Sequence, residues 1–185
     1  MAAIKWTKLS QKTIFTNDHW SYNLDNFVIE NGAKGEYHYV HTNGSTMIIP
    51  ITSEKKIILV KQFRYLNQKD SLEFPCGLNG SKLPPKENAL KELREETGFS
   101  ANLLEYIGEF SPYTGASDEM CKLYIATGLF YDPLPKDATE EGMETLYFTF
   151  EQLQNLITGN KIWDGLTLAS FSLAYNNIKM KIKND

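Results

Sequence analysis

The chain has 185 residues, of which 42% are hydrophobic and 23% charged, so its length suits one globular domain with room for a small appendage. Its longest apolar runs, MIIPI and IILV, are too short to cross a bilayer, and the first residues lack an apolar run of signal-peptide length. The net charge of −4 offers no general attraction to nucleic acid backbones. We therefore expect a soluble, cytoplasmic protein that binds neither membrane nor nucleic acid.

The first third of the chain is rich in Ile, Val, Thr, Tyr and Phe and is interrupted by turn groups such as TNGS and SEKK. This composition predicts a run of short, antiparallel strands. They are expected at residues 13–17, 21–30, 35–41, 46–52 and 55–65.

A helix is predicted next, at residues 84–98, because prolines open the segment and Gly98 closes it. Further strands and two terminal helices follow. The strands are expected at 102–110, 120–130 and 143–150, and the helices at 151–159 and 166–182. The order of elements predicts a compact α+β domain.

The central helix places Glu92, Glu95 and Glu96 on one arc and mainly apolar residues on the other side. Like charges at this spacing repel one another. Two interpretations stay open at this point. The arc is either a solvated acidic face balanced by Lys91 and Arg94, or a site for a hard divalent cation, which prefers carboxylate oxygens.

The segment from Gly77 to Phe99, GLNGSKLPPKENALKELREETGF, resembles the Nudix box, Gx5Ex7REUxEExGU, in which U is an aliphatic or aromatic residue. Leu83 stands where the pattern has Glu, and Lys91 stands where it has Arg. The positions that match are Gly77, Glu92, Leu93, Glu95, Glu96, Gly98 and Phe99.

The resemblance to the Nudix hydrolases implies a metal-dependent enzyme. Its implied ligands for Mg²⁺, or alternatively Mn²⁺, are Glu92, Glu95, Glu96 and the backbone carbonyl of Cys76. Lys91 carries the positive charge of the family's Arg but lacks the planar guanidinium that forms two parallel hydrogen bonds with a carboxylate. The implied fold is an α/β/α sandwich around a mixed β-sheet.

Two further segments resemble the pyrophosphatases of ADP-ribose and related nucleoside diphosphate sugars. VKQFRY followed by LEFPCG implies that Arg64 and Glu73 lie near the substrate and form an ion pair, and FSPYTGASDEM implies that Ser117 and Glu119 lie close to substrate or metal. Thr114 occupies a position where that subfamily usually carries a proline diagnostic of ADP-ribose specificity.

The same resemblance extends toward the C-terminus. ITGNKIWDGLTLASFSLA is similar to the segment that opens the last helix of these relatives. In the ADP-ribose type, the general base is a Glu on a loop after the sheet. The loop PKDATEEGMETL has the corresponding place, with Glu141 as first choice for the base and Glu140 as second.

The N-terminal segment has the character of the extra strands that these enzymes often use to form dimers. We expect residues 1–45 to be an antiparallel β extension that serves dimerisation, and residues 46–185 to be the Nudix domain. Trp20, Tyr22 and Tyr37 are candidates for stacking on a base, but a core or interface role is the interpretation we favour.

The expected function is divalent-metal-dependent hydrolysis of the pyrophosphate bond of a nucleoside diphosphate sugar, first of all ADP-ribose, to AMP and ribose 5-phosphate. The expected partners are this small molecule and a second copy of the chain. One alternative is a non-catalytic nucleotide-binding Nudix module that acts as a sensor or scaffold. Another is a Nudix hydrolase of a different sugar nucleotide or of a dinucleotide. Cys76 and Cys121 are expected to be free thiols.

Overall fold

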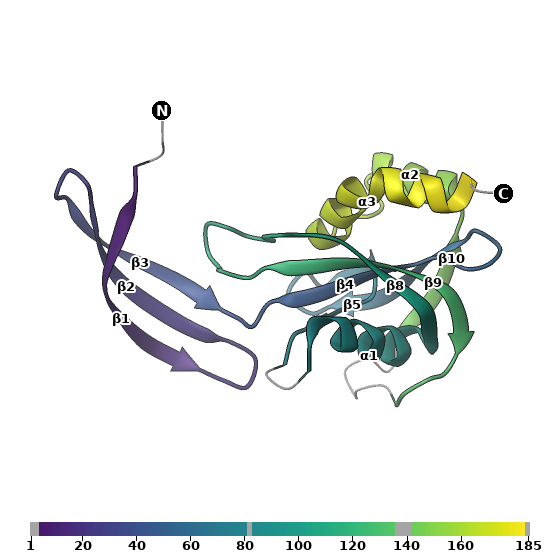
Figure 1. Ribbon diagram of the computed structural model, residues 1–185, viewed down its shortest axis with the longest axis horizontal. Coiled ribbons are helices and arrows are strands. Elements are labelled where there is room, and N and C mark those ends of the chain that lie inside the picture. The colour runs from purple at the N-terminus through teal and green to yellow at the C-terminus, as the bar shows by residue number, and fades with distance from the viewer. Residues whose placement is uncertain (1–3, 81–82, 136–141, 184–185) are drawn as a thin grey trace.

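A computed structural model describes residues 4–80, 83–135 and 142–183. Figure 1 shows a three-stranded sheet that projects to one side of a domain in which helices cover sheets. No helix in these described ranges is long and apolar enough to cross a membrane.

The projecting sheet consists of β1 (Trp6–Thr16), β2 (Ser21–Ile29) and β3 (Lys34–His41), paired antiparallel in this order. Every residue of β1 is exposed to solvent. We call these strands the extension. The antiparallel β extension expected from the sequence is therefore present.

The domain contains a mixed sheet in the order β7, β4, β9, β8. Its strands are β4 (Ser45–Pro50), β7 (Cys76–Leu78), β8 (Phe99–Phe110) and β9 (Cys121–Tyr131). β4 pairs parallel with β9, and the other pairs are antiparallel. The predicted mixed sheet is thus confirmed.

A second sheet of the domain has β5 (Ile57–Arg64) between β10 (Glu144–Phe148) and β6 (Lys69–Glu73), all antiparallel. Neither β6 nor β7 was predicted from the sequence. Both are short, and β6 has the sequence KDSLE, which lacks β-branched and aromatic residues.

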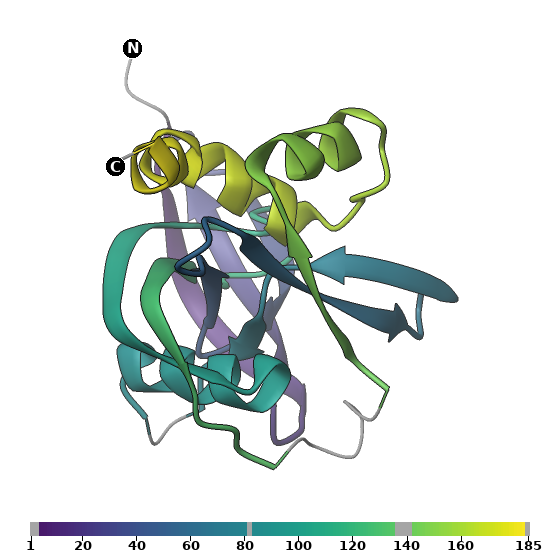
Figure 2. The ribbon, with the colours of Figure 1, turned by 90° about the vertical axis from the view of Figure 1, so that its right-hand side faces the viewer.

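In the described part of the chain, three helices cover the sheets from two sides. Figures 1 and 2 show α1 (Pro85–Thr97) below the sheets and α2 (Phe150–Thr158) and α3 (Gly165–Lys183) above them. α1 begins with proline at its first position, as predicted, and is capped after Thr97 by Gly98, whose φ of 78° suits a residue without a Cβ.

The core lies on both faces of the mixed sheet, because successive strand residues point to opposite sides. One hydrophobic cluster includes Ile49 of β4, Leu153 of α2 and Ile178 of α3. A second includes Ile48 of β4 and Leu93 of α1. This arrangement is the α/β/α sandwich that the sequence predicted.

Candidate active site

Two glutamates of α1 reach the short strand β7. Glu92 is 9% exposed, and its carboxylate occupies the space beside Gly77, where a Cβ would come within 2.1 Å of the carboxyl carbon. Glu96 is 4% exposed, and its Oε2 accepts a hydrogen bond from the Cys76 N–H at 3.3 Å. A side chain at position 77 would therefore displace the Glu92 carboxylate from its place beside the strand.

Lys91 lies between two of the box glutamates. Its Nζ donates a short hydrogen bond to Glu95 and lies 3.5 Å from Glu92 Oε1. Burial acts to lower the pKa of Lys91, but the hydrogen bond to Glu95 and the negative charges of both carboxylates outweigh it and raise the pKa. The lysine that replaces the pattern's Arg is therefore charged and paired with both neighbours.

The donors on α1 and β7 suit a hard divalent cation, because carboxylate and backbone carbonyl oxygens are the ligands such ions prefer. Within the described ranges, however, no three His, Cys, Asp or Glu side chains are gathered closely enough to hold a metal ion. The fit to a cation thus rests on the chemistry of the donors and on the approach of Glu92 and Glu96 to the backbone at Cys76 and Gly77.

Arg64 and Glu73 form the expected ion pair. Arg64 Nε donates to Glu73 Oε1 at 2.7 Å, and Arg64 Nη2 donates to Glu73 Oε2. Gln62 also donates to Glu73 Oε2, at 3.2 Å. Glu73 is 1% exposed, whereas 44% of the Arg64 side chain faces solvent. The hydrogen bonds from Arg64 to Glu73 raise the pKa of Arg64, so the guanidinium is held in place and stays charged.

A cavity of about 310 Å³ is lined both by Arg64, of the ion pair, and by Cys76 and Glu96, which belong to the proposed metal site. The sequence predicted three of its lining residues, Arg64, Cys76 and Glu96, as site residues. The remaining lining residues were not predicted, although three of them belong to the segment VKQFRY. The missed residues are Gln62, Phe63, Tyr65 and Met143.

A neighbouring cavity of about 340 Å³ lies at the other end of the box. Lys91 and Glu92 line it, together with Asn88 and Asp18. Asp18 belongs to the turn between β1 and β2, so the extension of the same chain reaches the box helix. No signal in the sequence indicated this approach.

Ser117 and Glu119 lie at the junction between the extension and the domain, and neither lines the cavity beside Arg64. Glu119 Oε1 accepts a hydrogen bond from Ser45 Oγ at 2.6 Å, and Ser117 Oγ accepts one from the Glu119 N–H at 3.1 Å. Asp118 between them pairs with His41 of β3 at 2.7 Å. These contacts tie the loop to the end of β3 and the start of β4.

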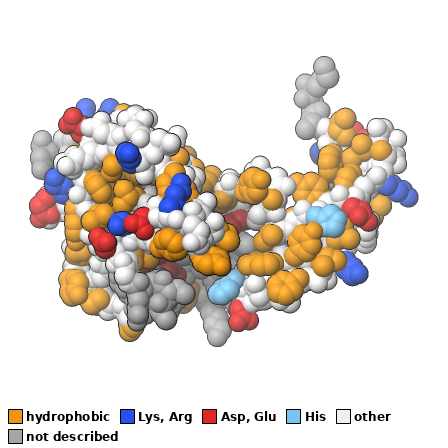
Figure 3. All heavy atoms as spheres, turned by 180° about the vertical axis from the view of Figure 1, so that it is seen from behind, with side chains coloured by type: hydrophobic (Ala, Val, Ile, Leu, Met, Phe, Trp, Pro, Cys, Tyr) orange, Lys and Arg blue, Asp and Glu red, His pale blue; other side chains and the backbone are white. Residues whose placement is uncertain are grey.

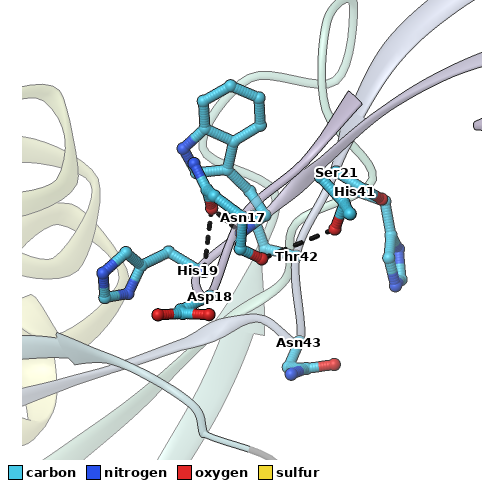
Figure 4. A pocket seen from close by; sticks show the side chains of 9 residues that line it. Asn17, Asp18, His19, Ser21, His41, Thr42 and Asn43 are labelled. Carbon is cyan, nitrogen blue, oxygen red and sulfur yellow. Dashed lines mark hydrogen bonds between the residues drawn. The ribbon is translucent and has the colours of Figure 1, made fainter. Parts of the chain in front are cut away.

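The turn between β1 and β2 borders a small hollow of about 160 Å³, which Figure 4 shows from close by. Asn17 shapes the turn, because its side-chain oxygen accepts hydrogen bonds from the backbone N–H groups of His19 and Trp20 at 2.9 Å each. Trp20 also packs against Phe15, with ring centroids 5.5 Å apart.

The expected general bases, Glu141 and Glu140, lie outside the described residues.

Comparisons with known proteins agree with this fold and these motifs. The NUDIX domain family matches residues 42–170. The chain is 30% identical over 164 residues to the methanol dehydrogenase activator of Bacillus methanolicus, which covers 85% of this chain and 89% of that protein. It is 27% identical over 180 residues to an ADP-ribose pyrophosphatase of Bacillus subtilis (strain 168), and the match covers 97% of this chain and 96% of that protein.

A solved structure described as an ADP compounds hydrolase superposes with a TM-score of 0.85 over 98% of both chains. At 21% identity, this likeness speaks for the fold. Together with the fold and the motifs, the family match shows that the chain belongs to the NUDIX domain family. Within that family it is a Nudix pyrophosphohydrolase, as the sequence analysis expected.

Proposed function

We propose that the protein hydrolyses the pyrophosphate bond of a nucleoside diphosphate sugar, with ADP-ribose as the first substrate, to AMP and ribose 5-phosphate. One observation carries the proposal: a single cavity is lined by Arg64, by Cys76 and by the buried Glu96. A diphosphate needs a cation that recognises its charge and carboxylates that hold a metal ion beside it. The likeness to an ADP-ribose pyrophosphatase over 97% of the chain supports the choice of substrate.

In this proposal, Glu92, Glu95, Glu96 and the carbonyl of Cys76 hold Mg²⁺ or Mn²⁺. A bound divalent ion would supply neutralisation of the phosphate oxygens and a lower pKa for a coordinated water. Lys91 would balance part of the negative charge of these ligands, because its ammonium pairs with the carboxylates of Glu92 and Glu95.

Arg64 is proposed to bind the anionic diphosphate, with Glu73 fixing the orientation of its guanidinium. Glu141, or Glu140 as second choice, is proposed to take the proton of the attacking water. For these two glutamates, and for substrate contacts of Ser117 and Glu119, the proposal rests on the family resemblance alone.

We further propose that residues 46–185 form the catalytic domain and that residues 1–45 join two copies of the chain. Figure 3 shows apolar side chains gathered along the extension, where they face solvent. A three-stranded sheet with a largely uncovered face gains stability when another surface covers it. The exposed apolar residues of the extension include Trp6, Leu9, Ile14, Phe15 and Tyr37. Cys76 and Cys121 are both free, which supports a reducing, cytoplasmic setting.

The proposal is tested with the purified protein, Mg²⁺ and a panel of ADP-ribose, other sugar nucleotides, dinucleotides and nucleoside triphosphates. We expect the highest kcat/KM for ADP-ribose, with AMP and ribose 5-phosphate as products on chromatography, and no turnover in the presence of a chelator. A higher kcat/KM for another member of the panel would identify that compound, instead of ADP-ribose, as the preferred substrate. Binding of nucleotides without turnover of any of them would contradict the proposal and favour a sensor or scaffold.

A further inference from the structure

The segment from Glu73 to Cys76, which we call the corner, joins β6 to β7 and carries both ends of the proposed site. At its start, Glu73 accepts the hydrogen bonds of Arg64. At its end, the Cys76 N–H donates to Glu96 on α1. A shift of the corner therefore moves the substrate-side guanidinium relative to the proposed metal ligands.

The middle of the corner is held by two other elements. The Pro75 carbonyl accepts a hydrogen bond from the Ile48 N–H of β4 at 2.9 Å. The Phe74 N–H donates to Thr167 Oγ1 on α3 at 3.2 Å. Thr167 is fully buried and Phe74 is 1% exposed, so this backbone N–H has no access to water as an alternative partner.

The first turn of α3 is anchored where it meets β6. Asp164 Oδ2 accepts a hydrogen bond from the Thr167 N–H at 2.7 Å, which fixes the backbone that carries the buried hydroxyl. Trp163 Nε1 donates to the Asp70 carbonyl at 3.1 Å, and Lys69 Nζ lies 4.0 Å from the Trp163 ring centroid. The segment WDGLT thus contacts β6 near the first residues of that strand, and it contacts the corner just after β6 ends.

We propose that Thr167 is a positioning residue of the active site: its buried hydroxyl fixes the corner, and so sets the position of the Arg64–Glu73 pair relative to Cys76 and Glu96. The inference rests on the proposed function for its kinetic consequence. Thr167 itself lies behind the corner and acts on substrate only through it. This role gives a physical meaning to the C-terminal segment that the sequence analysis singled out by resemblance alone.

The test compares Thr167→Val, which keeps the shape and removes the hydroxyl, with Thr167→Ser, which keeps the hydroxyl. We expect Thr167→Val to raise KM for ADP-ribose by about tenfold or more, because small misplacements in a site are costly. kcat should change less than KM. Thr167→Ser should restore KM to within about threefold of the wild type. Amide hydrogen exchange across residues 72–78 should be faster in Thr167→Val and unchanged in Thr167→Ser.

Ile178→Ala supplies the matched control, because Ile178 is fully buried on the same helix and belongs to the core rather than to the corner. It should lower Tm without changing KM. A wild-type KM in Thr167→Val, no rescue by serine, or an equal rise of KM in Ile178→Ala would overturn the inference.

Failure of the proposed function can be told apart from failure of this inference. A wild-type protein without turnover contradicts the function, and hydrogen exchange then decides the role of Thr167. Loss of protection at Phe74 in Thr167→Val, with protection kept in Thr167→Ser, supports the inference. Unchanged protection overturns it.

Discussion

β4 and β1 are both strands with β-branched and apolar residues, yet all of β4 is buried and all of β1 is exposed. β4 lies inside the mixed sheet with helices on both faces, whereas β1 is an outer strand of the projecting sheet. Strand-forming residues therefore predict the backbone conformation of a segment but not its burial. Burial follows from what the rest of the chain places on each face.

The extension compensates for its missing core with cross-strand contacts. Trp6 stacks on Phe27 with ring centroids 4.4 Å apart. Phe27 also lies over Gly35, its partner on β3, where a Cβ would come within 2.6 Å of the ring. Lys8 Nζ lies 3.0 Å from Asp25 on β2. Contacts of this kind contribute modestly, which is why a covering partner would matter for this sheet.

The largest expected difference between the two regions is in stability. Ile49→Ala in β4 removes a fully buried side chain, so it should lower the free energy of unfolding by about 2–5 kcal/mol. Ile14→Ala in β1 removes a side chain that is 46% exposed, so it should cost under about 0.5 kcal/mol. Urea denaturation at protein concentrations low enough to dissociate a dimer measures both.

If Ile14→Ala and Ile49→Ala lowered the free energy of unfolding of the dilute protein equally, the difference in burial between β1 and β4 would be contradicted. If Ile14→Ala lowered the free energy of unfolding only at high protein concentration, the extension would be buried against a second copy of the chain. Light scattering over the same concentration range identifies the dimer.

Local signals in the sequence predicted most elements of the domain. Prolines and Gly98 delimit α1 within one residue, because both have backbone preferences that act independently of tertiary contacts. β1 was predicted from Thr13 but begins at Trp6, since pairing with β2 extends it through polar residues. β6 and β7 owe their conformation to neighbouring strands, and such contacts are invisible in a single segment.

The site was predictable to the extent that its residues are close in sequence or belong to quoted motifs. Helical periodicity puts Glu92 and Glu96 on one arc, and both reach β7. The ion pair of Arg64 with Glu73 followed from the resemblance. The contact of Thr167 with Phe74 spans 93 residues, and no local pattern predicts it.

The second expected effect concerns charge, because Glu96, a proposed metal ligand, is a buried carboxylate of the domain. Glu96→Gln should lower turnover of ADP-ribose by about two orders of magnitude or more and leave the fold intact, because the proposed metal site would lose a charged ligand. Glu87→Gln is the matched control, since Glu87 lies on the exposed side of the same helix. Steady-state kinetics, circular dichroism and Mn²⁺ binding are the measurements. Near-wild-type turnover and Mn²⁺ affinity in Glu96→Gln would mean that the box carboxylates are not the metal site.

The smallest expected effect comes from Asp164, a half-buried carboxyl whose pKa responds to the Arg64–Glu73 ion pair. Burial and the charge of Glu73 raise the pKa of Asp164, against the hydrogen bonds from Thr167 and the charge of Arg64. The folded protein therefore holds this proton to higher pH than the unfolded chain, so the stability contributed by Asp164 falls as pH rises through its folded pKa. At neutral pH the charged form is the costly one.

Asp164→Asn keeps an oxygen that can accept the Thr167 N–H and removes the charge. At pH 7 it should raise Tm by no more than about 2–4 °C. The difference in Tm from the wild type should shrink on acidification, as the wild-type carboxyl becomes protonated. Glu36→Gln in the extension, where the side chain is 61% exposed, should change Tm at pH 7 by less than Asp164→Asn does. Calorimetry from pH 4 to 8 measures both variants. If the difference in Tm between Asp164→Asn and the wild type grew on acidification, the domain would stabilise the charge of Asp164 instead of penalising it. Burial would then not explain why the two carboxylates differ.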